Sequence, residues 1–191
     1  MRLLLISAIM FFSFGTHAMN NTLVGEVLKA QGLFDAVSVQ PQGLNWTVGD
    51  NAQYSIKMGF LQGTMDMKVR EKVAQGYWIE QDIDLGFAGK QLVEIIIDPN
   101  TGEIIELRVN GQKQQPPDSS GQEVVEMKED RVTVPAGTFD CVYLRVKDTS
   151  NNQESQAWLN PEEIPVMGLI KNISPSQFGD VTVELTGYEK K

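Results

Sequence analysis

Apolar and polar residues begin to alternate with a period of two after the turn-like stretch QPQG at residues 40–43, and the alternation continues to the end of the chain. The runs YSIKMG, LQGTMDMKVR, YWIEQDIDL, LVEIIID and EIIELRV follow one another, separated by short segments rich in Gly, Asp or Asn. Strands that recur at about 8 to 12 residues are typical of antiparallel sandwiches, barrels and curled sheets. The pattern therefore predicts a mainly β fold, as a single antiparallel curled sheet or half-open barrel.

Two local signals extend this prediction. The segment DPNTG at residues 98–102 separates two runs of high β propensity and predicts a hairpin turn. Before the alternation begins, NTLVGEVLKA at residues 21–30 carries Leu23, Val27 and Ala30 at helical spacing and is followed by Gly32. We therefore expect a short N-terminal helix in front of the sheet.

A polar segment divides the β region into two halves. NGQKQQPPDSSGQ, at residues 110–122, contains adjacent prolines and predicts a long loop. The second half is expected to resume with RVTV at 131–134, to turn through Pro135-Ala136-Gly137 and to continue as FDCVYLRVKD. ESQAWLN, GLIKNIS and DVTVELTGY supply three further candidate strands.

Residues 1–18 have the layout of a secretory signal peptide. Arg2 precedes the apolar run LLLISAIMFFSFG, and small residues stand three and one positions before a cleavage site after Ala18. The run is short for a membrane span, although a retained anchor is the alternative, and it lacks the cysteine of a lipoprotein acylation site. We expect a periplasmic or secreted protein with a single β-rich domain over residues 19–191 and no transmembrane segment after cleavage.

Charge and residue usage exclude several classes of function. The chain carries 16 Lys and Arg against 25 Asp and Glu, a formal net charge of −9, so we expect no nucleic-acid partner. The single histidine, His17, lies in the predicted signal peptide. Cys141 is therefore interpreted as a small buried hydrophobe, because no histidine remains to act as its base. We expect no catalytic residue, no metal site and no cofactor.

The candidate binding residues are apolar. Met65 and Met67 stand two apart on one strand-like run, and Met58 precedes the turn before it. Such thioethers pack flexibly in a core, line a surface that adapts to lipid, or bind copper(I), and core packing is the favoured interpretation. Trp78 and Trp158 complete the candidate ligand-binding set, because aromatic side chains that line a concavity form sites for apolar ligands.

Two clusters of carboxylates are candidates for catalysis or cation binding. In YWIEQDIDL, the side chains of Glu80, Asp82 and Asp84 share one face of a strand and suggest a carboxylate-only hydrolase. The favoured alternative is a solvated face whose carboxylates pair with Lys68 and Arg70 on the preceding strand. DPNTGE supplies Asp98, Asn100 and Glu103, as part of a calcium loop would, but a plain hairpin is favoured because the third ligand position and the distant Glu of a full loop are missing.

Part of the chain resembles a group of exported bacterial proteins of unknown function. The resemblance rests on VPAGTF at residues 134–139, Trp158, Pro161 with Pro165, and GLIK at residues 168–171. More distantly, the succession of strands is similar to the half-open barrels of lipoprotein-localisation carriers of the LolA and LolB type, in which a concave apolar face shelters acyl chains. These resemblances imply a curled sheet and a binding role, and they carry over no catalytic residue.

Three hypotheses of function follow. The first is a non-catalytic exported module that binds a hydrophobic ligand, such as a lipid, or an envelope component on the concave face of the sheet. The alternative is a structural or protein-interaction module, with an envelope protein as partner and an edge strand or the polar segment 110–122 as its contact surface. The third is the carboxylate-only hydrolase.

Overall fold

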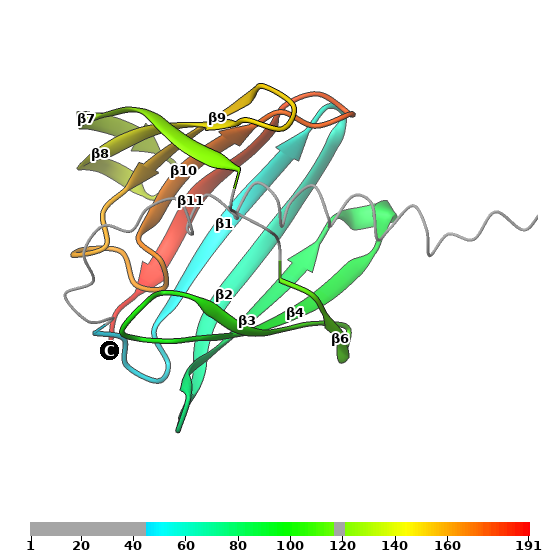
Figure 1. Ribbon diagram of the computed structural model, residues 1–191, viewed down its shortest axis with the longest axis vertical. Coiled ribbons are helices and arrows are strands. Elements are labelled where there is room, and N and C mark those ends of the chain that lie inside the picture. The colour runs from blue at the N-terminus through cyan, green and yellow to red at the C-terminus, as the bar shows by residue number, and fades with distance from the viewer. Residues whose placement is uncertain (1–44, 117–120) are drawn as a thin grey trace, which may run out of the picture.

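The computed structural model describes residues 45–116 and 121–191, which form one antiparallel sheet of 11 strands (Figure 1). The strands are β1 (Asn51–Met58), β2 (Leu61–Val73), β3 (Gly76–Asp84), β4 (Lys90–Ile97), β5 (Ile104–Val109), β6 (Gln112–Gln114), β7 (Gln122–Val134), β8 (Gly137–Asp148), β9 (Gln153–Leu159), β10 (Leu169–Ser174) and β11 (Val181–Glu189). A short 3₁₀ helix, η2 (Gly86–Ala88), connects β3 to β4. The predicted signal peptide and the predicted helix at 21–30 lie outside the described residues.

The strands are ordered β6-β5-β4-β3-β2-β1-β11-β10-β9-β8-β7 across the sheet. Most neighbours in the sheet are also neighbours along the chain, whereas β1 and β11, the first and last described strands, pair with each other inside it. Among the described strands, β6 and β7 are the two edges and do not pair with each other, so the sheet is not closed into a barrel. The prediction of a mainly β fold with a single antiparallel sheet is confirmed.

The sheet curls strongly, so that its β7 end returns towards its middle (Figure 1). The turn between β7 and β8 reaches back to β11, where the backbone N–H of Ala136 donates a hydrogen bond to the carbonyl oxygen of Leu185 at 3.1 Å. Three strands stand between β7 and β11 in the sheet order. The sheet must therefore bend for this contact to form. The VPAGTF turn of residues 134–139 is the segment that makes the contact.

The two faces of the sheet differ in chemistry. The inner face, defined here as the face that carries Tyr54 and Ile56 of β1, is apolar and buried, whereas the outer face carries most of the charged side chains of β1 to β5. Each large apolar side chain buried in this way contributes about 1.5–3 kcal/mol to folding. The largest fully buried side chains are Tyr54, Ile56, Met58, Met65, Met67, Ile79, Ile83, Leu144, Ile164, Leu169, Ile170 and Leu185.

The loop between β9 and β10 shows why the motif that ends in GLIK contains a glycine after its prolines. The backbone N–H of Asn160 donates to the carbonyl oxygen of Gly168 at 2.8 Å, which closes the loop over Pro161. Gly168 adopts φ +72°, and a Cβ there would lie 2.6 Å from the backbone of Pro161. A glycine is needed at this position because a side chain would be both strained and in collision with the proline.

The hairpin predicted at residues 98–102 is confirmed, since the N–H of Gly102 donates to the carbonyl oxygen of Asp98 at 2.9 Å between β4 and β5. The long loop predicted at residues 110–122 is wrong in part, because β6 forms inside it and pairs with β5. β7 also begins at Gln122, well before the expected residue 131, and pairs with β8 along its length. Nearly all of β7 is exposed on both sides, so its sequence lacks the alternation by which strands are recognised.

Candidate functional site

The three candidate methionines lie together on the inner face. Met58 of β1 stands opposite Val181 of β11, and Met65 and Met67 follow on the adjacent strand β2. Their exposed fractions are 1%, 0% and 1%, so each thioether is enclosed by the core. The favoured interpretation of these residues as core side chains agrees with this burial.

Gln81 of β3 is a polar residue in the middle of this apolar face. It stands directly opposite Met67 of β2 and Val93 of β4, and its exposed fraction is 0%. Among the residues that the structure describes, neither its side-chain oxygen Oε1 nor its nitrogen Nε2 has a hydrogen-bond partner. A buried amide without partners costs about 1–3 kcal/mol, so its presence requires an explanation.

Three other buried polar side chains of the inner face, those of Asn172, Ser174 and Tyr54, are paired. Asn172 of β10 donates through Nδ2 to the carbonyl oxygen of Gln156 at 3.1 Å, and the hydroxyl of Ser174 donates to Asn172 Oδ1 at 2.9 Å. The hydroxyl of Tyr54 donates to the carbonyl oxygen of Leu169 at 3.1 Å, and burial raises the pKa of this phenol, which therefore stays neutral. Gln81 thus differs from these three residues.

Gln81 was not among the residues selected from the sequence. The signal was present, because in YWIEQDIDL the glutamine occupies the same phase of the alternation as Ile79 and Ile83, which face the core. The alternation does not show whether a neighbouring strand supplies a hydrogen-bond partner for the amide. That depends on the register of β2 and β4 against β3.

Trp78 lies on the outer face, at the centre of a network of charged side chains. The guanidinium of Arg70 lies 4.4 Å from the centroid of the indole ring and that of Arg108 lies 4.9 Å from it, so two cations stack on one tryptophan. The indole nitrogen Nε1 is buried and has no hydrogen-bond partner in the described part of the chain. Trp78 thus serves as a platform for the two arginines.

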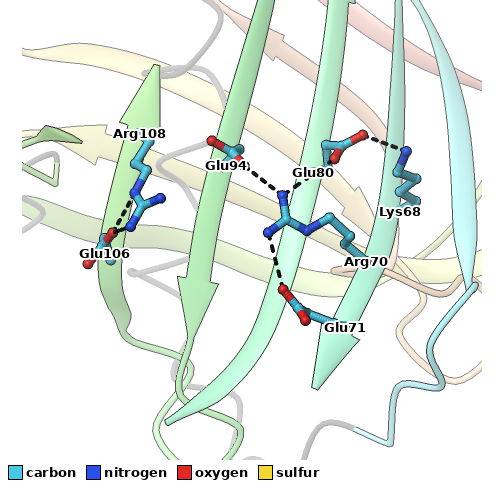
Figure 2. A network of polar contacts seen from close by, with 7 residues as sticks. All are labelled: Lys68, Arg70, Glu71, Glu80, Glu94, Glu106 and Arg108. Atoms are coloured by element: carbon cyan, nitrogen blue, oxygen red, sulfur yellow. Dashed lines mark hydrogen bonds and ion pairs between the residues drawn. The ribbon is translucent and has the colours of Figure 1, made fainter. Parts of the chain in front are cut away.

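Figure 2 shows the charged residues of this network on β2 to β5. Arg70 contacts Glu94 at 2.7 Å, Glu71 at 3.1 Å and Glu80 at 3.8 Å, and Lys68 also pairs with Glu80. On β5, Arg108 contacts Glu106 at 2.6 Å, and Lys113 together with Arg108 holds the pKa of Glu106 below its ordinary value. Since each cation already has a carboxylate partner, this network stabilises the outer face and offers no free charge to a ligand.

Trp158 lies in a second outer-face cluster, on β9. Its indole N–H donates to Asp130 Oδ2 at 2.8 Å, its ring packs against Tyr143 with centroids 5.1 Å apart, and the ammonium of Lys171 lies 5.8 Å from its centroid. The five candidate binding residues are therefore divided, with the three methionines on the inner face and Trp78 and Trp158 on the outer face.

Two of the three carboxylates considered for hydrolysis, Glu80 and Asp84, are engaged in ion pairs. Glu80 pairs with Lys68 and Arg70, in agreement with the favoured interpretation of this face. Asp84 pairs instead with Lys90 at 2.8 Å, and the hydrogen bond from Lys90 and the backbone N–H of Gly86 lower its pKa. A general acid needs a raised pKa, so Asp84 is poorly suited to that role.

Cys141 is half-buried at the edge of the core. Its thiol donates to the carbonyl oxygen of Asp130 at 3.4 Å, and burial together with the charge of Asp130 raises its pKa. Within residues 45–116 and 121–191, His, Cys, Asp and Glu side chains form no group of three or more suited to a metal ion. The same residues contain no helix of the length and apolar character needed to cross a membrane.

Comparison with known proteins finds a likeness of fold at low similarity. No protein-family model matches the chain, and no curated protein sequence matches it. It is similar to MucB in a crystal structure with MucA(peri), at 15% identity and a TM-score of 0.46, over 84% of this chain and 55% of that one. It is also similar to an exported Bacteroides fragilis protein with a YmcC-like fold, at 11% identity and a TM-score of 0.41, over 78% of this chain and 99% of that one.

A Pseudomonas aeruginosa MucA/MucB complex gives similar values, with 12% identity and a TM-score of 0.42 over 84% of this chain and 56% of that one. The chain thus spans about half the length of the MucB chains that it matches. With TM-scores below 0.5, these similarities assign no function to the chain.

Proposed function

We propose that this protein is a non-catalytic, exported binding module, periplasmic or secreted, that takes an apolar ligand bearing one hydrogen-bonding group on its inner face. The observation that carries the proposal is the unpartnered amide of Gln81, fully buried between Met67 and Val93. A ligand with an apolar body and a single polar group pairs with the amide through its polar group and packs its apolar body against the surrounding apolar side chains.

The chemistry of the amide defines the ligand group. Nε2 of Gln81 donates to a carbonyl or ether oxygen, and Oε1 accepts from a hydroxyl or an amide N–H. Lipid esters, amides and fatty alcohols carry such groups next to long apolar chains. A ligand group that pairs with Gln81 recovers the free energy that the unpaired amide costs.

The methionines support this proposal because they allow the inner face to adapt. Met67 lies beside Gln81 in the register, and Met65 lies two residues away on the same strand. A thioether side chain is unbranched and flexible, so it rearranges around ligands of different shape at little cost. Since these residues are enclosed, a ligand reaches Gln81 only when the side chains of the inner face move.

Binding of a fatty alcohol that carries a dansyl label, and so combines an apolar chain with a neutral hydroxyl group, tests the proposal. The expected result is an increase in dansyl fluorescence with the wild-type protein, and a loss of affinity of about tenfold or more in Gln81→Leu, which corresponds to 1.4 kcal/mol. Gln53→Leu, on an exposed residue of the outer face, is the matched control and is expected to bind as the wild type does. Equal affinity in both variants would overturn the role of Gln81, and no binding by the wild type would overturn the proposed ligand class.

A second candidate function is a protein-interaction module. The specific observation in its favour is the long exposed edge strand β7, rather than the polar segment at 110–122 that the sequence suggested. The hydrolase hypothesis is not favoured, because ion pairs engage two of its three candidate carboxylates, Glu80 and Asp84.

A further inference from the structure

Two phenylalanines at one end of the sheet stack on each other while most of their surface faces water. Phe60 is 84% exposed and Phe87 is 83% exposed. Their rings are nearly parallel, with centroids 6.3 Å apart, although Phe60 belongs to the turn between β1 and β2 and Phe87 to the connection between β3 and β4. Two rings that contact each other and remain this exposed form a protrusion, and exposed apolar surface of this kind marks an interaction site.

Short connections hold the rings in place. The turn between β1 and β2 has two residues, and it lies beside the loop between β10 and β11 (Figure 1). A Cβ at Gly59 would stand 2.9 Å from the carbonyl oxygen of Phe178, so the turn packs directly on that loop. Phe178 is itself 40% exposed, which adds a third phenylalanine to this end of the sheet.

The residues next to the two rings are small. Gly59 precedes Phe60, and Gly86 and Ala88 flank Phe87. We refer to these five residues as the aromatic tip. Because the tip carries no charged or polar side chain, it enters an apolar medium without removing such a group from water.

The backbone of the connection between β3 and β4 pairs within itself. The N–H of Gly86 donates to Asp84 Oδ1 at 2.9 Å, that of Ala88 to the carbonyl oxygen of Leu85 at 3.2 Å, and that of Gly89 to the carbonyl oxygen of Gly86 at 3.0 Å. Backbone groups enter a lipid phase at low cost only when they are already paired. This connection therefore suits contact with lipid.

The charged side chains behind the tip are paired with one another. Lys57, two residues before the tip, contacts Glu184 at 3.4 Å, and Lys90 contacts Asp84 at 2.8 Å. Each of these ammonium groups has a carboxylate partner, and the chain as a whole has a formal net charge of −9. This balance disfavours anionic headgroups and is compatible with zwitterionic ones.

We propose that the aromatic tip docks this protein on the surface of a bilayer of zwitterionic phospholipids. Both rings insert at the boundary between headgroups and acyl chains, where phenylalanine is found in proteins that lie on membranes. The inference goes beyond the proposed function, because it uses no residue of the inner face and requires no ligand there.

The size of the tip argues against a protein, including a second copy of this chain, as the partner. An aromatic side chain buries about 150–250 Å². Two rings therefore fall well short of the roughly 800 Å² that each partner buries in a stable protein interface. A fluid bilayer closes around a protrusion of this size, so a few inserted side chains are enough for it to bind.

Sedimentation with vesicles of dioleoylphosphatidylcholine tests the proposal. We expect the wild type to sediment with the vesicles, and the double variant Phe60→Ser/Phe87→Ser to partition about tenfold more weakly or less. Ile105→Ser/Met127→Ser, on two exposed apolar side chains elsewhere in the sheet, is the matched control and is expected to sediment as the wild type does. All proteins are purified after export, so that they share one N-terminus, and thermal unfolding checks that each variant folds.

A fluorescent probe locates the contact. Phe60→Trp adds a tryptophan to the tip, and we expect vesicles of brominated phosphatidylcholine to quench the added fluorescence. Met127→Trp places the probe away from the tip, and its added fluorescence is expected to persist. Exchange of part of the lipid for the anionic phosphatidylglycerol is expected to leave binding unchanged or to weaken it.

Four results would overturn the inference. They are a wild type that does not sediment with phosphatidylcholine vesicles, equal partitioning of the Phe60→Ser/Phe87→Ser variant and its control, and binding that requires phosphatidylglycerol. The fourth is a wild-type dimer in light scattering that the Phe60→Ser/Phe87→Ser variant dissociates, since a second copy of the chain would then cover the tip.

Two further measurements separate this inference from the proposed function. Gln81→Leu is expected to sediment with the vesicles as the wild type does. The Phe60→Ser/Phe87→Ser variant is expected to bind the dansyl-labelled fatty alcohol with the affinity of the wild type. Failure of either proposal is therefore visible without failure of the other.

Discussion

Met67 of β2 and Gln81 of β3 stand directly opposite each other on the inner face, so a thioether lies beside an amide that has no hydrogen-bond partner within residues 45–116 and 121–191. In the absence of ligand, replacement of this glutamine by leucine removes an unsatisfied group at little change in volume. We expect Gln81→Leu to raise the free energy of unfolding by about 1–3 kcal/mol in urea titrations of ligand-free protein.

Asn172→Leu is the control for that measurement. Asn172 is buried as well, but it pairs with Gln156 and Ser174, so its loss leaves two polar groups without partners. We expect this variant to be destabilised by about 1–3 kcal/mol. Equal destabilisation in the two variants would show that Gln81 is satisfied in solution.

Arg70 and Glu94 are expected to be energetically coupled. They contact at 2.7 Å across the outer face, where the glutamate side chain is only 12% exposed and the arginine also stacks on Trp78. A double-mutant cycle with Arg70→Ala and Glu94→Ala is expected to give a coupling of about 0.5–1 kcal/mol, which falls as salt is added. A coupling of zero at low salt would contradict the network seen in Figure 2.

Gly168→Ala is expected to destabilise the protein more than Gly111→Ala. Both glycines have φ between +70° and +80°, but a Cβ at Gly168 would collide with Pro161, whereas a Cβ at Gly111 meets no atom within 4 Å. Both variants therefore carry a similar backbone strain of about 1 kcal/mol from the positive φ. The difference between their free energies of unfolding measures the cost of the collision with Pro161. Equal melting temperatures would mean that the loop moves away from the new methyl group at no cost.

The pKa of Asp130 is expected to rise when Trp158 is replaced by phenylalanine. The indole N–H first, and then the backbone N–H of Arg131, hold this pKa below its ordinary value of 3.8. Because the folded pKa is the lower one, the stability it contributes is present above pH 3.8 and is lost as the pH falls through the folded pKa. Carboxyl NMR titration of wild type and Trp158→Phe checks the shift, and an unchanged pKa would rule out the hydrogen bond.

Cys141 is expected to react slowly with iodoacetamide at neutral pH. Burial and the neighbouring charge of Asp130 raise its pKa, so little of the reactive thiolate is present. Asp130→Asn removes that charge and is expected to speed the reaction without altering the fold. A rate for the wild type equal to that of free cysteine would contradict the raised pKa.

The sequence was sufficient for those strands in which one face is buried. β3 shows this well, since Ile79 and Ile83 alternate with Glu80 and Asp82 just as the sheet requires. β7 was largely missed because a strand exposed on both sides has no alternation to detect, and its pairing with β8 is what holds it in place. Strand identity can be read locally only where burial imposes a pattern.

The candidate site shows a second limit. Met67 and Trp78 were grouped because both are apolar, yet the register of β2 against β3 puts them on opposite faces. The spacing of Trp78, Glu80 and Asp82 along one strand predicts that these three side chains share a face. Whether Trp78 shares a face with Met67 depends on the register of β2 against β3. For the same reason, the missing partner of Gln81 could be found only in three dimensions.

The pairing of β1 with β11 has a consequence for how the protein matures. Asn51 stands opposite Glu189, so the middle of the sheet joins residues from nearly opposite ends of the described chain. Contacts this distant in sequence form slowly, and these cannot form at all before β11 has left the ribosome. If the chain is exported as its first 18 residues predict, the sheet cannot be completed between β1 and β11 until β11 has passed through the translocation channel, so the polypeptide stays unfolded enough to be transported.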